Sequence, residues 1–229
     1  MIKTDIDTAI DDERRKTGTG FIAVAEKTRY ENQALQDISR KVDFYEQEAT
    51  QDFTFSPEVA LSAVNALSSV APNLKTTGAI ITVNPLSSTT QHLNRIRPED
   101  FQHILSGNYF AQAGSDLWVR SGGKSGDTLR VRYVANYVAK TSGGTLSAAM
   151  RSDDDEPIND IDPEAVVAFV LWKIFRKEGK KDDARESKKR YDEILKSIIQ
   201  NNLYRRAGTF DRQTIEDAQQ HDWTNHIGT

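Results

Sequence analysis

Residues 161–202 read IDPEAVVAFVLWKIFRKEGKKDDARESKKRYDEILKSIIQNN, and this stretch decides the fold. Asp162 can accept a hydrogen bond from the backbone N–H groups of a first helical turn, and Pro163 suits the first helical position. Glu164 complements the positive end of the helix. A helix is therefore expected to begin at this point and to end at Gly179, which suits a left-handed stop.

The first expected helix is apolar nearly all round. From Ala165 to Phe175 almost every residue is hydrophobic, and such a helix must be covered by other parts of the protein. An amphipathic helix is expected to follow, from Asp182 to Asn202, because its large apolar residues recur at helical spacing. The stretch thus predicts an antiparallel helical hairpin, whose expected core residues are Val166, Phe169, Val170, Trp172, Ile174, Tyr191 and Leu195.

Composition limits the possible classes of protein. The chain has 229 residues, of which 37% are hydrophobic and 28% charged, so it can bury a core but is leaner than an average domain. It contains no cysteine, which excludes disulfides, thiolate metal sites and a cysteine nucleophile. A net charge of −4 is not the basic footprint of a duplex-binding protein. No window reaches the ~20 apolar residues of a membrane span, and no secretory signal is apparent, so we expect no membrane association.

Five segments follow from the patterns along the chain. Helices are expected in residues 1–75, the third of them beginning at Ser56-Pro57-Glu58 with Val59, Ala63, Leu67 and Val70 as its apolar stripe. Asn32 is a candidate cap of the helix before it. A small antiparallel β region is expected in 76–140, with strands at 79–83, 101–109, 117–119 and 129–133, the last two forming a hairpin around a glycine-rich turn. Residues 141–161 form an acidic linker, 162–202 the helical hairpin and 203–229 an arm.

These segments predict an α+β fold. Helices from both ends of the chain are expected to pack as a bundle, with the β region inserted between them and the arm extending from the C-terminal side.

No motif in the sequence supports catalysis, a cofactor or a metal. Gly123-Lys124-Ser125 contains the end of a phosphate-binding loop, but Trp118 stands where that motif needs a glycine. The acidic run 153–156 lacks the spaced ligands and central glycine of a calcium loop. The four histidines lack zinc-site spacing. We therefore expect a protein that is not an enzyme.

The C-terminal arm combines arginines with aromatic residues. Such side chains can stack on and neutralise a nucleic acid, but they are also common anchors of protein interfaces. Four acidic residues in the same segment dilute its positive charge and favour a protein partner, while an unfolded tail without function remains an alternative. The candidate anchors are Tyr204, Arg205, Arg206, Phe210 and Trp223.

Three stretches, in this order, resemble bacteriophage head-to-tail adaptor proteins, also called head-completion or connector proteins. Ile96-Arg-Pro-Glu-Asp-Phe101 is similar to the family's entry into its β region. Leu117-Trp-Val-Arg120, the glycine-rich turn and Asp127-Thr-Leu-Arg-Val-Arg-Tyr133 resemble the hairpin that follows. Asp162-Pro-Glu-Ala-Val166, Gly179 and the stretch from Lys180 to Tyr191 resemble the terminal pair of helices.

The resemblance implies a structural virion protein of the neck, made in the host cytoplasm. Such subunits form a ring, typically of twelve, that joins the portal to the tail protein or the next neck ring, while genomic DNA passes through the lumen without sequence-specific binding. The arm residues would then contact the portal, and the loop of Gly122, Gly123, Lys124 and Gly126, with residues 86–94, would face the tail. A different neck or tail protein, such as a tail terminator, and a nucleic-acid-binding packaging accessory are the alternatives.

Overall fold

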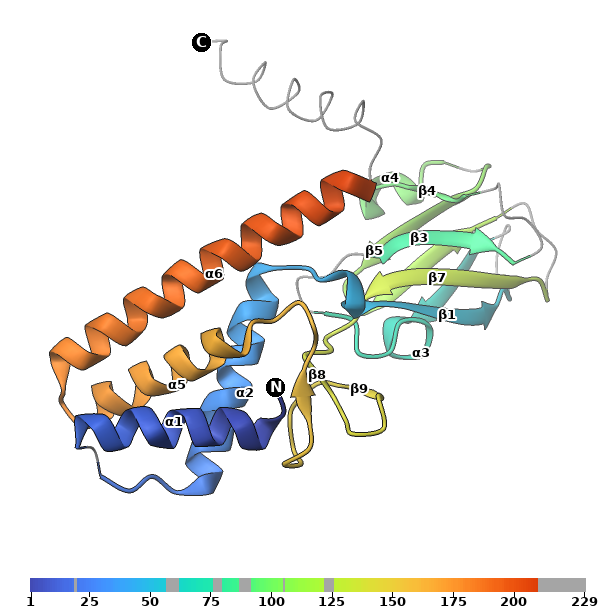
Figure 1. Ribbon diagram of the computed structural model, residues 1–229. Helices are drawn as coiled ribbons and strands as arrows, with labels where there is room; N and C mark the ends of the chain where they lie inside the picture. Colours follow the sequence, from blue (N-terminus) through green and yellow to red (C-terminus); the bar gives the residue numbers. More distant parts are fainter. Residues whose placement is uncertain are drawn as a thin grey trace, which may run out of the picture. The chain divides into compact units, whose positions relative to one another are not determined.

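The chain has an α+β fold, as the sequence predicts. The computed structural model (Figure 1) describes residues 1–18, 20–56, 62–75, 80–86, 92–104, 106–121 and 126–209, apart from the side chains of 45, 62–63 and 203–209. Two compact units make up the chain. The helical unit comprises Met1–Phe44 and Val138–Thr229, and the strand unit comprises Tyr45–Tyr137.

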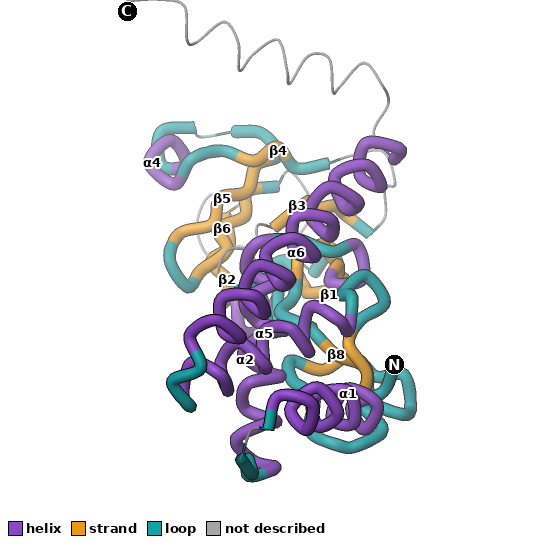
Figure 2. The backbone as a smooth tube through the Cα atoms, turned by 60° about the vertical axis from the view of Figure 1, so that its left-hand side comes forward, coloured by secondary structure: helices purple, strands orange, loops and turns teal. Residues whose placement is uncertain are grey.

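The helical unit contains the four long helices of the described chain and a small sheet. The helices are α1 (Lys3–Thr17), α2 (Val24–Lys41), α5 (Pro163–Lys177) and α6 (Lys181–Thr209). Helix α5 contacts α1, α2 and α6, and the two views in Figures 1 and 2 show it among them. The small antiparallel sheet has the order β10-β8-β9, with β8 at Ala139–Lys140, β9 at Leu146–Ser147 and β10 at Glu156–Pro157.

The first helix of the hairpin begins and ends as its sequence predicts. The Asp162 carboxylate accepts a hydrogen bond of 2.9 Å from the backbone N–H of Glu164, and Pro163 occupies the first turn of α5. Gly179 has φ +78°, the left-handed conformation that glycine adopts without steric cost. Helix α6 then begins at Lys181 and continues to Thr209, beyond the expected end at Asn202.

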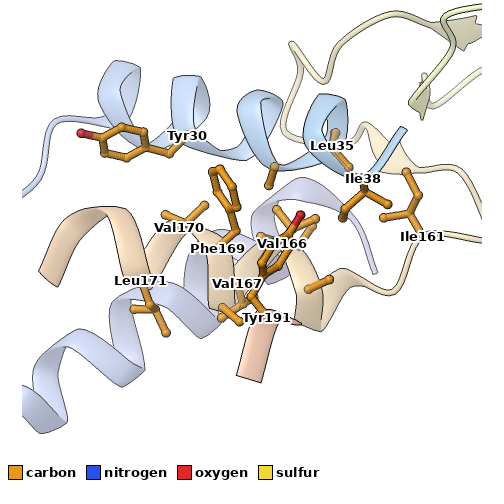
Figure 3. Close-up of a cluster of buried hydrophobic side chains, with 14 of the residues drawn as sticks. Tyr30, Leu35, Ile38, Ile161, Val166, Val167, Phe169, Val170, Leu171 and Tyr191 are labelled. Atoms are coloured by element: carbon orange, nitrogen blue, oxygen red, sulfur yellow. The ribbon is translucent and has the colours of Figure 1, made fainter. Parts of the chain in front are cut away.

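One hydrophobic core joins helices from both ends of the chain. Helix α5 is buried nearly all round, and its side chains meet Ile6 and Ile10 of α1 and residues of α2 and α6. Figure 3 shows Phe169 and Val170 of α5 facing Tyr30 and Leu35 of α2. Fully burying a large apolar side chain stabilises a fold by about 2 kcal/mol before chain entropy is subtracted, so α5 is the main source of hydrophobic stabilisation in this unit.

Residues 141–161 are folded against the helices rather than forming a linker. The backbone N–H of Lys3 donates to the Asp155 carbonyl (2.7 Å), and that of Thr4 donates to the Asp153 carbonyl (3.2 Å). The Asp155 carboxylate accepts from the N–H groups of Arg151 and Ser152 at 2.6 and 2.9 Å. The turn thus satisfies the buried Asp155 carboxylate locally, which allows this charged segment to pack here.

Asn32 is not a helix cap, because α2 begins eight residues earlier in the chain, at Val24. Its side-chain amide lies in the middle of the helix and forms two hydrogen bonds with the backbone of Met150. Asn32 Nδ2 donates to the Met150 carbonyl (2.9 Å), and the Met150 N–H donates to Asn32 Oδ1 (2.8 Å). The residue therefore fastens the 141–161 segment to α2.

The strand unit consists of two sheets that share a second core. One has the order β1-β7-β3, and the other β2-β6-β5-β4. Leu117 and Val119 of the second sheet and Leu129 and Val131 of the first belong to the same cluster of buried side chains. The strands are β1 (Glu48–Thr54), β2 (Ser62–Ala66), β3 (Ile80–Pro85), β4 (Asn94–Arg95), β5 (Tyr109–Ala113), β6 (Asp116–Arg120) and β7 (Thr128–Val134); the short helices are α3 (Leu67–Val70), α4 (Pro98–Phe101) and the 3₁₀ turn Tyr45–Gln47.

Helices were predicted for residues 1–75, but they do not continue to residue 75. Strand β1 occupies 48–54 and strand β2 occupies 62–66, and within the described part of the predicted third helix only Leu67–Val70 is helical. The i, i+4 spacing of apolar residues there gave a helical pattern, but pairing of β2 with the distant strand β6 decides the structure. The predicted start at Pro57 lies outside the described residues.

Two further expectations for the β region are wrong. Residues 101–109 hold the end of α4 and a turn, and the strand begins only at Tyr109. Strands β6 and β7 do not form a hairpin, since β6 pairs with β2 and β5 while β7 pairs with β1 and β3. The chain therefore passes from one sheet to the other between Arg120 and Thr128. The strand predicted at 79–83 corresponds to β3.

Candidate functional site

The predicted core of the hairpin is buried. Val166, Phe169, Val170, Ile174, Tyr191 and Leu195 all belong to the core of the helical unit, and Trp172 is partly exposed at its edge. The Phe169 ring packs edge-on against both Trp172 (5.3 Å between ring centroids) and Tyr191 (5.2 Å). Burial and the hydrogen bond that the Tyr191 hydroxyl donates to Asp37 raise the pKa of Tyr191. These residues hold the helices together.

Most of the predicted interface residues lie where the structure gives no side-chain geometry. Tyr204, Arg205 and Arg206 lie in the last turns of α6, but their side chains are outside the described residues, as are Phe210 and Trp223. Gly122, Gly123 and Lys124, and positions 87–91 of the other loop, are outside them too. Gly126 has φ +95°, and its N–H donates to the Phe55 carbonyl (2.9 Å). The roles assigned to these residues stay predictions.

The stretch 96–101 that carries part of the family resemblance packs on strand β6. The Phe101 ring lies 5.7 Å from the Trp118 ring, and the Arg120 guanidinium lies 4.7 Å from the Phe101 ring centroid. Arg120 also donates from Nη1 to the Phe101 carbonyl (3.1 Å). Helix α4 is thereby held against the outer side chains of the sheet.

A cluster of buried charges that the sequence did not predict lies where α1, α2 and the 151–155 turn meet. Lys3 Nζ lies 2.7 Å from Asp7 Oδ2 and 3.7 Å from both Glu31 Oε2 and Asp153 Oδ1. Lys27 Nζ lies 2.8 Å from Asp7 Oδ1. Glu31 is fully buried and Lys3 is only 2% exposed, so water screens these interactions poorly.

Burial and the neighbouring carboxylate Asp7 raise the pKa of Glu31 to about 8. Burial alone would raise the pKa of Asp7 as well, but hydrogen bonds from Lys27 and Lys3 outweigh it and lower that pKa. Neither Glu31 oxygen accepts a hydrogen bond within the described residues. A protonated Glu31 that donates to Asp7 accounts for both shifts, because one proton shared between two carboxyl groups avoids a second buried negative charge.

Helical spacing gave one signal for this cluster. Lys3, Asp7 and Asp11 follow each other at intervals of four on α1, and Lys27 and Glu31 are four apart on α2. Such spacing places the charges on one stripe of each helix, but it does not reveal that the two stripes face each other. The cluster fastens α1 to α2 and to the 151–155 turn, which is a structural role.

A cleft of about 300 Å³ opens where α5 begins and α6 approaches its end. Phe44, Ile161 and Ile198 line it with buried apolar side chains, and Ser197 and Asn201 are exposed beside them. Asp160 and Asp162 also line it, whereas none of its lining residues is basic. The cleft can therefore hold an apolar side chain next to a positive charge.

The helical hairpin also places one aromatic ring among lysines. Lys173 Nζ lies 4.4 Å and Lys188 Nζ 5.6 Å from the centroid of the Trp172 ring. Lys173, Arg176, Lys181 and Arg185 form no salt bridge with the residues that the structure describes.

Comparisons with known proteins do not identify the chain. No family model matches it, and no curated protein sequence matches it significantly. Within the ranges that the structure describes, no group of three or more His, Asp or Glu is arranged to hold a metal ion. Nor do the described helices include one that is long and apolar enough to cross a membrane.

Proposed function

We propose that this chain is a structural subunit of a bacteriophage neck, a head-to-tail adaptor that forms a ring between the portal and the tail. The order of its parts carries the proposal. A strand unit is inserted between helices from the two ends of the chain, those helices share one core, and a long final helix leads to the C-terminal segment. This order agrees with the resemblance for the terminal pair of helices, whereas β6 and β7 do not form the hairpin that the resemblance implies.

The physical character of the described residues supports a structural role. The buried charges fasten helices to one another, and the hairpin residues singled out from the sequence serve the core. A ring subunit requires surfaces that contact its neighbours, and it requires no reaction centre. In this proposal the C-terminal arm contacts the portal, and the glycine-rich loop at 122–126 contacts the tail side.

Co-sedimentation with portal rings encoded by the same genome tests this function. The adaptor proposal predicts that the protein pellets with the portal and saturates at a fixed ratio of subunits. A protein that stays in the supernatant at every portal concentration contradicts it. Bovine serum albumin, which has no reason to bind, controls for trapping in the pellet.

The two lysines beside the Trp172 ring favour a second candidate function, a packaging accessory that binds nucleic acid. Lysines and arginines bind phosphates, and an exposed aromatic ring can stack on a base. This candidate predicts duplex or single-strand binding that weakens steeply as salt is raised. Lys173→Glu with Arg185→Glu should then abolish the binding, and the absence of any DNA binding at low salt would remove this candidate.

A further inference from the structure

The N-terminal end of α1 is held on the 151–155 turn by polar contacts. The backbone N–H groups of Lys3 and Thr4 donate to two carbonyl groups of that turn, and the Thr4 hydroxyl donates to one of them at 3.0 Å. Within the described residues 1–18, Ile6 is the first whose side chain belongs to the hydrophobic core. These three hydrogen bonds, which we call the N-terminal contact, therefore hold an end of the helix that has little apolar packing.

Lys3 links the N-terminal contact to the buried carboxyl group of Glu31 on α2. The backbone N–H of Lys3 belongs to the contact, while its Nζ lies 3.7 Å from Glu31 Oε2, beyond the distance of a hydrogen bond. The other charged groups around Glu31 are Asp7 of α1, Lys27 of α2 and, through Lys3, Asp153 of the turn. The N-terminal contact and Glu31 are thus parts of one cluster.

Both lysines of this cluster are already paired with carboxylates. Lys3 Nζ donates to Asp7 at 2.7 Å, and Lys27 Nζ lies 2.8 Å from Asp7 and 3.0 Å from Asp11. The charges of two lysines and two carboxylates therefore balance while Glu31 is neutral. An ionised Glu31 adds a negative charge that is fully buried and has no hydrogen-bond donor among the described residues, which is costly unless water reaches it.

We propose that ionisation of Glu31 opens the N-terminal contact, so that the first turn of α1 separates from the 151–155 turn while the rest of the helical unit stays folded. Glu31 cannot move outward by itself, because Leu35 and Ile38 fix its helix in the core. The N-terminal contact, in contrast, consists of hydrogen bonds that water can replace at little net cost. Opening it admits water to the carboxylate and removes the cost of the buried charge.

The contact is thus closed in acidic and neutral solution and opens in alkaline solution. The inference concerns a single copy of the chain, so it goes beyond the adaptor function and does not depend on it.

Amide hydrogen exchange of the full chain, followed by NMR between pH 6 and pH 8, tests this opening. Protection factors, which correct for the intrinsic effect of pH on exchange, should fall for the N–H groups of Lys3 and Thr4 by about tenfold per pH unit, because the open state releases the Glu31 proton and the closed state holds it. The N–H of Val170, in the middle of the buried helix α5, should stay at least about a hundredfold more protected at every pH, since it exchanges only when the whole unit unfolds.

Two variants of α2 separate Glu31 from other acidic groups. Glu31→Gln cannot ionise, and the protection of Lys3 and Thr4 should then be independent of pH in this range. Glu26→Gln is the matched control, because Glu26 lies on the same helix but pairs with Lys177 outside the cluster. This control should keep the pH dependence of the wild type.

Three outcomes overturn the inference. They are a wild-type protection of Lys3 and Thr4 that does not change with pH, a Glu31→Gln variant that keeps the wild-type dependence, and exchange of Lys3 and Thr4 that is as slow as that of Val170. The first and the last are measured on the wild type alone, so a variant that fails to fold leaves the test intact.

Discussion

Glu31 is the residue whose ionisation is expected to matter most for stability. Its pKa of about 8 in the folded chain lies above the ordinary value of 4.5, so the folded state holds the proton more tightly than the unfolded state. Its contribution to the free energy of unfolding is therefore complete below about pH 4.5 and is lost as the pH rises through 8. Asp7 acts in the opposite sense, because its lowered pKa removes stability only as the pH falls below the ordinary value of 3.8.

The substitution Glu31→Gln separates these effects. The wild-type melting temperature should fall between pH 5 and pH 9, and the variant should show a flatter profile, since its neutral amide cannot ionise beside Lys3, Asp7, Lys27 and Asp153. Differential scanning calorimetry at a series of pH values measures both. Equal slopes for wild type and variant in this range would contradict the protonated state of Glu31.

The cap of α5 gives a second prediction for a single residue. Asp162→Ala removes the hydrogen bond to the Glu164 N–H and should lower the free energy of unfolding by about 1 kcal/mol in urea titrations. Asp154→Ala is the control at an exposed acidic residue and should change it by less than about 0.5 kcal/mol. Equal losses for the two variants would contradict the capping role of Asp162.

Single residues were predictable from the sequence where a local rule applies and not elsewhere. Asp162 and Gly179 follow from the chemistry of helix ends, which depends on a few neighbouring residues. The role of Asn32 could not be predicted, because its amide forms hydrogen bonds with Met150, which lies 118 residues away in the chain. Glu31 was missed for the same reason, since its environment comes from another helix.

Among the secondary-structure elements, α5 carries the largest share of the core. Phe169 packs between Trp172 and Tyr191, and Phe169→Ala should lower the free energy of unfolding by about 3–5 kcal/mol. Trp172→Ala should cost clearly less, because Trp172 is partly exposed and its site can fill with water. Urea unfolding followed by circular dichroism compares the two, and a larger loss for Trp172 would contradict the packing described for α5.

Helices proved easier to predict than strands for a physical reason. The hydrophobic pattern and caps of α5 and α6 lie within the segment itself, whereas β2 and β7 are defined by partners far along the chain. Arg130 and Arg132 show this well, because they alternate on β7 to meet Asp52 and Glu48 of β1. The alternation indicated a strand, but it could not indicate which strand pairs with it.

At the scale of the whole molecule, the C-terminal segment is the part assigned to the portal. Deletion of 203–229 should abolish portal binding in co-sedimentation while leaving the helical circular dichroism signal nearly intact, because Ile198 is the last buried residue among the side chains described for α6. A shorter deletion, of 210–229, keeps Tyr204, Arg205 and Arg206 and locates the contact more finely. Undiminished portal binding by the longer deletion would remove the role given to the arm.

Two features of the whole fold could be predicted from the sequence, because composition and periodicity change along it. These are the α+β class and the packing of the C-terminal helices with the N-terminal ones. The division into units was not, since the strand unit begins at Tyr45, within the part expected to be helical. Nothing local marks that position, and pairing of β1 with β7 decides it.

The mass of the purified protein, alone and after mixing with the portal of the same genome, tests the adaptor proposal most directly. The account predicts a monomer or weak oligomer alone, and with the portal a complex whose added mass corresponds to one closed ring of copies matching the portal symmetry. A portal mass that does not change on mixing, together with binding of the protein to a DNA fragment, would contradict it and favour the nucleic-acid-binding function instead.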